Sequence, residues 1–212
     1  MKLVATFLAV LGVSLSAYGS SITLTNFAGG TSNLVADAGG NLLPNGSGYA
    51  AIGVFGGSDA DISGYATTGG AAGRDALAAD FTQFANSVTI GFNNFAGIYQ
   101  SVVTDAISAG DAFDGKPVYT VVGNGSTLAG SGQALVYKHA HNFAADPAPT
   151  ANAVLGSSAG GTLLVGDFDK FKATLGPIDN QPAYSLHLFI PEPSTASFLG
   201  LGLGVLLLRR KR

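Results

Sequence analysis

A serine, an aspartate and a histidine occur in an order that could form a hydrolytic triad. Ser158 is the central residue of a G-x-S-x-G pattern, and Asp167 and His187 follow it in the chain. In serine hydrolases this pattern is a sharp turn between a strand and a helix, which presents the serine hydroxyl as the nucleophile. Here the next residues, GTLLVGDF, are typical of a strand, and His187 follows too soon to leave room for crossover units. We therefore predict a serine–glycine turn and a protein that is not an enzyme.

Two histidines, His139 and His141, alternate in the run KHAHN. This spacing places both imidazoles on one face of a strand, as two ligands of a zinc ion would be. No third ligand is evident nearby in the sequence, and Lys138 adds a like charge. We predict a surface or edge-strand pair rather than a metal site.

Two pairs of aspartates could each give hard oxygen ligands to Ca²⁺. Asp59 and Asp61 lie in a glycine-rich run, and Asp167 and Asp169 form the run DFD. Calcium takes six to eight oxygens, and aspartates in turns commonly accept hydrogen bonds from their own backbone. A glycosidase would need two carboxylates facing each other, and the sequence singles out no such pair. We predict no metal or cofactor.

Aromatic side chains could form a platform for carbohydrate. The chain has no tryptophan, and its body carries six tyrosines: Tyr49, Tyr65, Tyr99, Tyr119, Tyr137 and Tyr184. Most of them lie in expected strands, where cross-strand packing is the ordinary role of a tyrosine. An exposed line of these tyrosines on one sheet face would favour a carbohydrate-binding module, which is the alternative function. A buried set would count against it.

The composition is that of a single folded domain with few charges. The chain has 212 residues, of which 47% are hydrophobic and 11% charged, with 31 glycines and no cysteine. This hydrophobicity excludes a disordered chain, and the lack of cysteine excludes disulfides and thiolate metal sites. Between 20 and 190 there are five basic residues and twelve aspartates, a net charge of about −7. An acidic body with no basic stripe excludes nucleic acid as a partner.

Alternating apolar and polar residues predict a mostly β body at 20–190. The expected strands are 21–27, 49–55, 87–92, 117–123, 133–139, 161–168 and 183–190. Clusters of glycine, asparagine, aspartate and serine separate them. The turn at Asn124–Gly125 predicts a hairpin that pairs Val118–Val122 with Ala134–Lys138.

The residue patterns of two segments predict short helices. Leu77, Phe81 and Phe84 have the spacing of one helical face within 73–87, and 167–176 could form one or two turns. Several short strands with little helix indicate an all-β fold, an antiparallel β-sandwich or jelly roll.

The N-terminus has the pattern of a secretory signal peptide. Lys2 precedes an apolar run at 3–15, and Ala17 and Gly19 are the small residues of a cleavage site. Cleavage after Ala17 is a near alternative. We predict a signal helix at 1–19 and an exported protein.

The C-terminus combines a proline-rich motif, a short apolar run and a basic end. The run at 196–208 has 13 apolar or small residues, a helix of roughly 20 Å against a membrane core of about 30 Å. Snorkelling arginines and bilayer thinning cover this difference, and the basic end holds the C-terminus in the cytoplasm. Gly200 and Gly204 form a G-x-x-x-G pattern, which here indicates a glycine- and leucine-rich helix. We predict a short transmembrane helix within 191–212.

These last 22 residues resemble the PEP-CTERM sorting signal of Gram-negative bacteria. The matching residues are the motif Pro191, Glu192 and Pro193 and the basic cluster Arg209, Arg210, Lys211 and Arg212. The resemblance implies a precursor held transiently in the inner membrane and processed near the motif by an exosortase. The body would then reach the cell surface or the exopolysaccharide matrix. We expect a structural or adhesive, non-enzymatic role there, with exopolysaccharide as a candidate partner.

Overall fold

The structure, a computed structural model, describes residues 19–189 apart from 29–30, 157–159 and 176–177. These residues are mostly β, with 45% in strands and 15% in helices, which confirms the predicted fold class at this level. No helix among them is long and apolar enough to cross a membrane. The predicted signal helix and the predicted transmembrane helix lie outside the described residues.

A main sheet of six strands forms the centre of the fold. Its strands are β5 (Tyr49–Phe55), β6 (Phe81–Thr89), β8 (Pro117–Gly123), β9 (Gln133–Asn142), β11 (Thr162–Val165) and β14 (His187–Leu188). The order is β11-β9-β8-β5-β6, and β14 also pairs with β9. All these pairings are antiparallel. The predicted hairpin is confirmed by β8 and β9, in which Val122 lies opposite Leu135.

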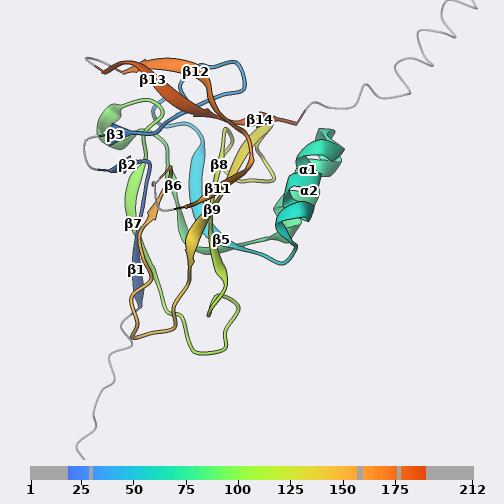
Figure 1. Cartoon of the computed structure of the whole chain (residues 1–212), viewed down its shortest axis with the longest axis vertical. Helices are drawn as coiled ribbons and strands as arrows, with labels where there is room; N and C mark the ends of the chain where they lie inside the picture. Colours follow the sequence, from blue (N-terminus) through green and yellow to red (C-terminus); the bar gives the residue numbers. More distant parts are fainter. Residues whose placement is uncertain (1–18, 29–30, 157–159, 176–177, 190–212) are drawn as a thin grey trace, which may run out of the picture.

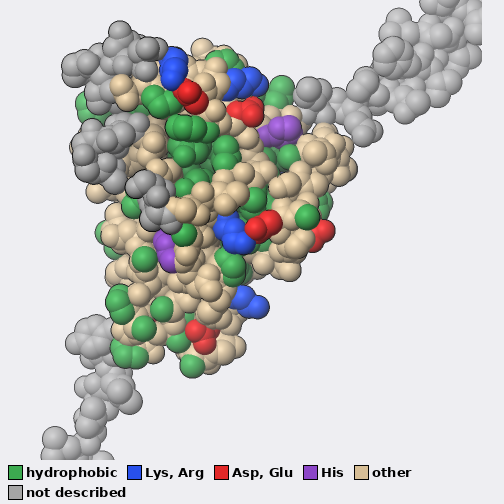
Figure 2. Space-filling view, viewed as in Figure 1, with side chains coloured by type: hydrophobic (Ala, Val, Ile, Leu, Met, Phe, Trp, Pro, Cys, Tyr) green, Lys and Arg blue, Asp and Glu red, His purple; other side chains and the backbone are tan. Residues whose placement is uncertain are grey.

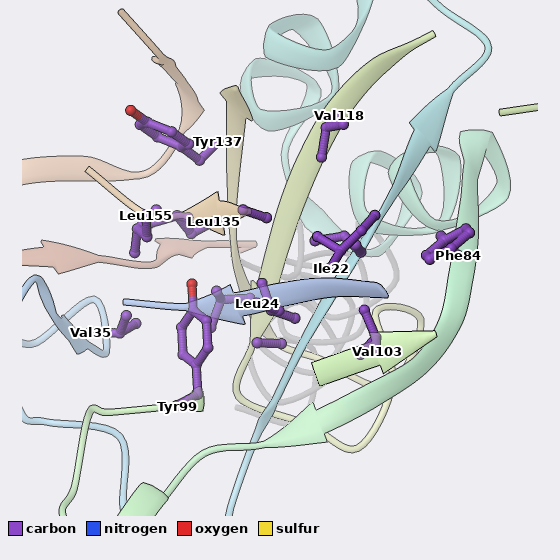
Figure 3. Close-up of a cluster of buried hydrophobic side chains, with 14 of the residues drawn as sticks. Ile22, Leu24, Val35, Phe84, Tyr99, Val103, Val118, Leu135, Tyr137 and Leu155 are labelled. Carbon is purple, nitrogen blue, oxygen red and sulfur yellow. The ribbon is translucent and has the colours of Figure 1, made fainter. Parts of the chain in front are cut away.

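A second sheet covers one face of the main sheet. It contains β10 (Ala153–Val154), β1 (Ser20–Thr25) and β7 (Gln100–Asp105), in that order. Ile22 and Leu24 of β1 point into a shared core with Val118 and Leu135 of the main sheet (Figure 3). Two sheets with a common core are consistent with a β-sandwich.

Two helices cover the other face of the main sheet (Figure 1). They are α1 (Asp59–Thr68) and α2 (Gly70–Asp80). Ile62 and Leu77 are completely buried in a second core, together with Tyr119 and Val136 of the main sheet. Helix α1 begins with a capping box, in which Ser58 and Asp61 bond each other's backbone N–H groups.

The central strands are therefore buried on both faces. Every residue of β5 is buried, and its side chains alternate between the two cores. Ala50 and Ile52 face the second sheet, whereas Ala51 and Phe55 face the helices. This double burial explains why β5 and β8 are almost continuous apolar runs.

A third sheet closes the end of the molecule at the top of Figure 1. It contains β12 (Asp167–Leu175), β13 (Ile178–Ser185) and β4 (Leu34–Ala36), in that order. The chain crosses from β11 to β12 at Gly166, whose φ is 105° and where a Cβ would lie 2.6 Å from the Ser185 carbonyl oxygen. Glycine alone suits this crossing. The remaining elements are the strands β2 (Phe27–Ala28) and β3 (Thr31–Ser32) and the 3-10 turn η1 (Phe92–Asn94).

Several sequence predictions of the fold are wrong. The sheets are not purely antiparallel, since β1 pairs with β10 and β13 pairs with β4 in parallel. The helix expected at 73–87 ends at Asp80, because Phe84 lies in β6 and packs in the core against Phe113 and Phe143. The helix expected at 167–176 is strand β12 up to Leu175. The glycine- and aspartate-rich run at 56–65, expected to separate two strands, instead contains the start of helix α1.

Replacing Leu77 by alanine tests the helical cover of the main sheet. We expect Leu77→Ala to lower the free energy of unfolding by about 2–5 kcal/mol, because it removes a completely buried side chain between α2 and the sheet. Leu188→Ala makes the same chemical change at a side chain that is 43% exposed, and it should cost less than about 1 kcal/mol. Urea unfolding of both variants measures the difference; equal costs would contradict the role of Leu77.

Candidate functional site

The sequence disfavours a serine triad, and the structure gives its described residues other partners. Ser158 lies outside the described residues. The Asp167 carboxylate lies 3.5 Å from the ammonium of Lys170. His187 is on β14, and its ring packs edge-on against Phe189, with 5.2 Å between the ring centroids.

The histidine pair lies on the core side of β9. His139 is buried, and its Nε2 is 2.8 Å from the Thr120 hydroxyl on the neighbouring strand β8. His141 is half-buried, with its ring 5.3 Å from that of His139. The predicted surface or edge-strand position is wrong for His139, because β9 is paired along both edges. Burial lowers the pKa of His139 to about 3, and the neighbouring His141 adds to this shift.

Asp59 and Asp61 have separate structural roles at the start of α1. The Asp59 carboxylate accepts hydrogen bonds from the Tyr119 hydroxyl at 3.0 Å and from the Lys138 ammonium at 2.8 Å. The hydrogen bond from Lys138 contributes most to holding the Asp59 pKa below its usual value. Asp61 instead accepts the Ser58 hydroxyl at 2.6 Å and the Ser58 N–H at 2.8 Å. The Asp59 carboxylate therefore joins α1 to β9, and the Asp61 carboxylate caps the start of α1.

The second aspartate pair is neutralised by lysines on β12. Lys170 lies beside Asp167, and Lys172 pairs with Asp169. Within the ranges that the structure describes, no three histidine, aspartate or glutamate side chains are grouped as a metal ion would require.

The six tyrosines do not form an exposed line. Five of them are buried: Tyr49, Tyr99, Tyr119, Tyr137 and Tyr184. Tyr65 is half-buried, and its hydroxyl lies 3.4 Å from an Asp80 carboxylate oxygen. This arrangement counts against the tyrosine face that a carbohydrate-binding module of the expected kind would need.

An open pocket with aromatic walls lies where the main sheet meets the third sheet. The pocket has a volume of about 360 Å³ and is lined by Tyr137, Gly156, Gly160, Gly161, Leu163, Phe168 and Tyr184. We call it the aromatic pocket. In Figure 2 hydrophobic side chains gather on this face below β12 and β13. No charged side chain is among the lining residues.

The rings of the aromatic pocket come from three different strands. Phe168 of β12 and Tyr184 of β13 are cross-strand partners, and their ring centroids are 4.5 Å apart. Tyr137 of β9 meets Tyr184 edge to face at 6.1 Å. Phe168 keeps 48% of its surface exposed, whereas Tyr137 and Tyr184 are buried. Sequence reasoning missed this site because its residues lie far apart in the chain, and the only local signal was the glycine-rich run before β11.

No protein-family model matches this chain, and no curated protein or solved structure is significantly similar to it.

The burial of His139 predicts a loss of stability in mild acid. Its folded-state pKa of about 3 lies below its ordinary value of about 6.5, so between these values the unfolded chain binds more protons than the folded chain. Stability therefore falls as the pH falls, by about 2 kcal/mol between pH 7 and pH 5 for this one group. Urea unfolding at half-unit steps of pH measures this change in the free energy of unfolding. His139→Gln should remove most of this slope.

A matched variant separates titration from the loss of a hydrogen bond. Thr120→Val removes the partner of His139 but leaves the imidazole buried. It should lower stability by about 1 kcal/mol at every pH and keep the slope. If His139→Gln retains the full slope of the parent, the proposed origin of the pH dependence is wrong.

Calcium should leave the stability of the protein unchanged. The described oxygens of Asp59 and Asp61 already accept hydrogen bonds from three different side chains, and two carboxylates fall short of six to eight oxygens. Thermal melting in EDTA and in millimolar Ca²⁺ should give the same Tm. A rise of several degrees that Asp61→Ala abolishes would instead identify a calcium site.

Proposed function

We propose that this protein is exported and is sorted by its last 22 residues to the cell surface or the exopolysaccharide matrix. There it has a structural or adhesive, non-enzymatic role on a β-sandwich scaffold. The observation that carries the proposal is the order of three features at the C-terminus: Pro191–Pro193, the apolar run and the basic cluster at 209–212. An exosortase-type enzyme would process the precursor near the motif.

The position of Phe189, the last described residue, supports the proposal. Phe189 is buried, and its N–H donates to the Gly132 carbonyl at 3.1 Å. Only Ile190 separates this residue from Pro191. The first described strand begins at Ser20, and β1 and β14 lie at opposite ends of the molecule (Figure 1).

The partners of the reactive side chains support a non-enzymatic role. His139 bonds to Thr120, and Asp59 bonds to Lys138 and Tyr119. A polysaccharide-acting enzyme would need two aspartates facing each other across a cleft, and the lining of the aromatic pocket contains none. The negative charge of the body is suited to solubility outside the cell.

Replacing the basic cluster tests the sorting proposal. We expect Arg209–Arg212→Ser (all four basic residues) to reduce the amount of full-length precursor in the membrane fraction, because 13 apolar residues are a marginal span and the cluster stops translocation. Cell fractionation and immunoblotting with a tag inside the body measure precursor and processed forms. Protease added to intact cells should digest the processed body.

A control variant keeps the tail and removes three positive charges from the body. Lys116, Lys170 and Lys172 are exposed, and replacing all three by serine should leave membrane retention and processing unchanged. The sorting proposal fails if the tail variant shows the same membrane-bound precursor and the same processing as the parent. It also fails if the body stays inside the cell.

A further inference from the structure

The half-exposed ring of Phe168 is held in a fixed position at the aromatic pocket. Its centroid lies 4.5 Å from that of Tyr184, with 39° between the ring planes. Tyr184 is itself buried and is held edge to face by Tyr137. A ring that is supported on one side and open on the other can bind the apolar face of a ligand with little loss of side-chain entropy.

The surroundings of the ring are electrically neutral. Burial raises the pKa of Tyr184 to about 12 and also raises that of Tyr137, so both hydroxyls stay protonated. The charged residues next to Phe168 on β12 are paired with each other, Asp167 with Lys170 and Asp169 with Lys172. In Figure 2 positive and negative side chains lie side by side near the hydrophobic area. The pocket therefore offers no net charge to a ligand.

Glycines bring the backbone close to two tyrosine hydroxyls at the pocket wall. Gly156, Gly160 and Gly161 line it, and they have no side chains to cover their peptide groups. A Cβ on Gly161 would collide with the Tyr137 hydroxyl, and one on Gly156 would lie 2.7 Å from the Tyr184 hydroxyl oxygen. Close approach of backbone to these two hydroxyls thus requires glycine. The wall combines hydroxyls and peptide groups, which can hydrogen-bond to the hydroxyls of a sugar.

We propose that the aromatic pocket binds a neutral sugar unit of a polysaccharide chain, stacked on Phe168. A pyranose ring has an apolar face and a rim of hydroxyls, which match the ring and the glycine wall. The pocket is open to the surface, so a polysaccharide chain could extend from the bound unit through this opening. The binding itself does not depend on export; only the identity of the polysaccharide as matrix material rests on the proposed function.

Titration with defined sugars tests this proposal. The full chain is purified in a detergent without a sugar headgroup, and binding is followed by isothermal titration calorimetry. The neutral ligands are cellohexaose, maltohexaose and isomaltohexaose; glucose and an oligogalacturonate are the comparisons. We expect at least one neutral hexasaccharide to bind more tightly than both comparisons.

Variants at Phe168 identify the site. Phe168→Ala and Phe168→Leu should each weaken binding by about fivefold or more, because neither offers a ring, whereas Phe168→Tyr should keep the affinity. Phe95→Ala is the matched control, since Phe95 is 49% exposed but is not among the residues that line the aromatic pocket. It should leave binding unchanged. Circular dichroism confirms that each variant is folded.

Each other result overturns the proposal. Absence of binding by all three neutral hexasaccharides, or tighter binding of the oligogalacturonate, would exclude a neutral-sugar site. Unchanged affinity of Phe168→Leu would show that the ring is not the platform. Glucose binding as tightly as the hexasaccharides would indicate a free-sugar site and not a chain-binding one. None of these results bears on sorting, which cell fractionation tests separately.

Discussion

The central strands of the main sheet need apolar cover on both faces, and the other elements are arranged to provide it. Strands β5 and β8 are buried along almost their whole length. The sheet of β10, β1 and β7 covers one face, and α1 and α2 cover the other. Each fully buried Leu, Ile or Phe contributes about 1.5–3 kcal/mol, so each cover contributes several kcal/mol, whereas the whole stability of an ordinary domain is about 5–15 kcal/mol.

Some polar side chains inside this arrangement are stabilising because they find hydrogen-bond partners. Asn26 is completely buried; its amide group donates to the Asn33 and Gly97 carbonyls and its oxygen accepts the Tyr99 N–H. The pair of Asp59 and Lys138 fastens the start of α1 to β9 in the same way. The residue types that first indicated chemistry are thus part of the scaffold. The functions proposed above rest on two other features, the aromatic pocket and the last 22 residues of the sequence.

The sequence predicted the central strands well and their surroundings poorly. The bounds of β5 and β8 match the expected runs, since double burial produces a local apolar signal. Helix α1 was missed because its glycine- and aspartate-rich start is typical of a turn, while only the capping box of Ser58 and Asp61 marks a helix. Phe84 has the spacing of a helical face but lies in β6, because its side chain packs in the core there. The aromatic pocket depends on residues brought together only by the crossing at Gly166.

Hydrogen exchange of backbone amides tests most directly whether the main sheet is the centre on which the covers depend. Strands β5 and β8 are paired along both edges and covered on both faces, whereas α1, α2 and β12 each pack on one side only. The amides of Ala51 and Val121 should therefore exchange only through global unfolding, and those of the helices and of β12 through smaller openings. Helix or β12 amides that exchange as slowly as those of β5 and β8 would contradict this account.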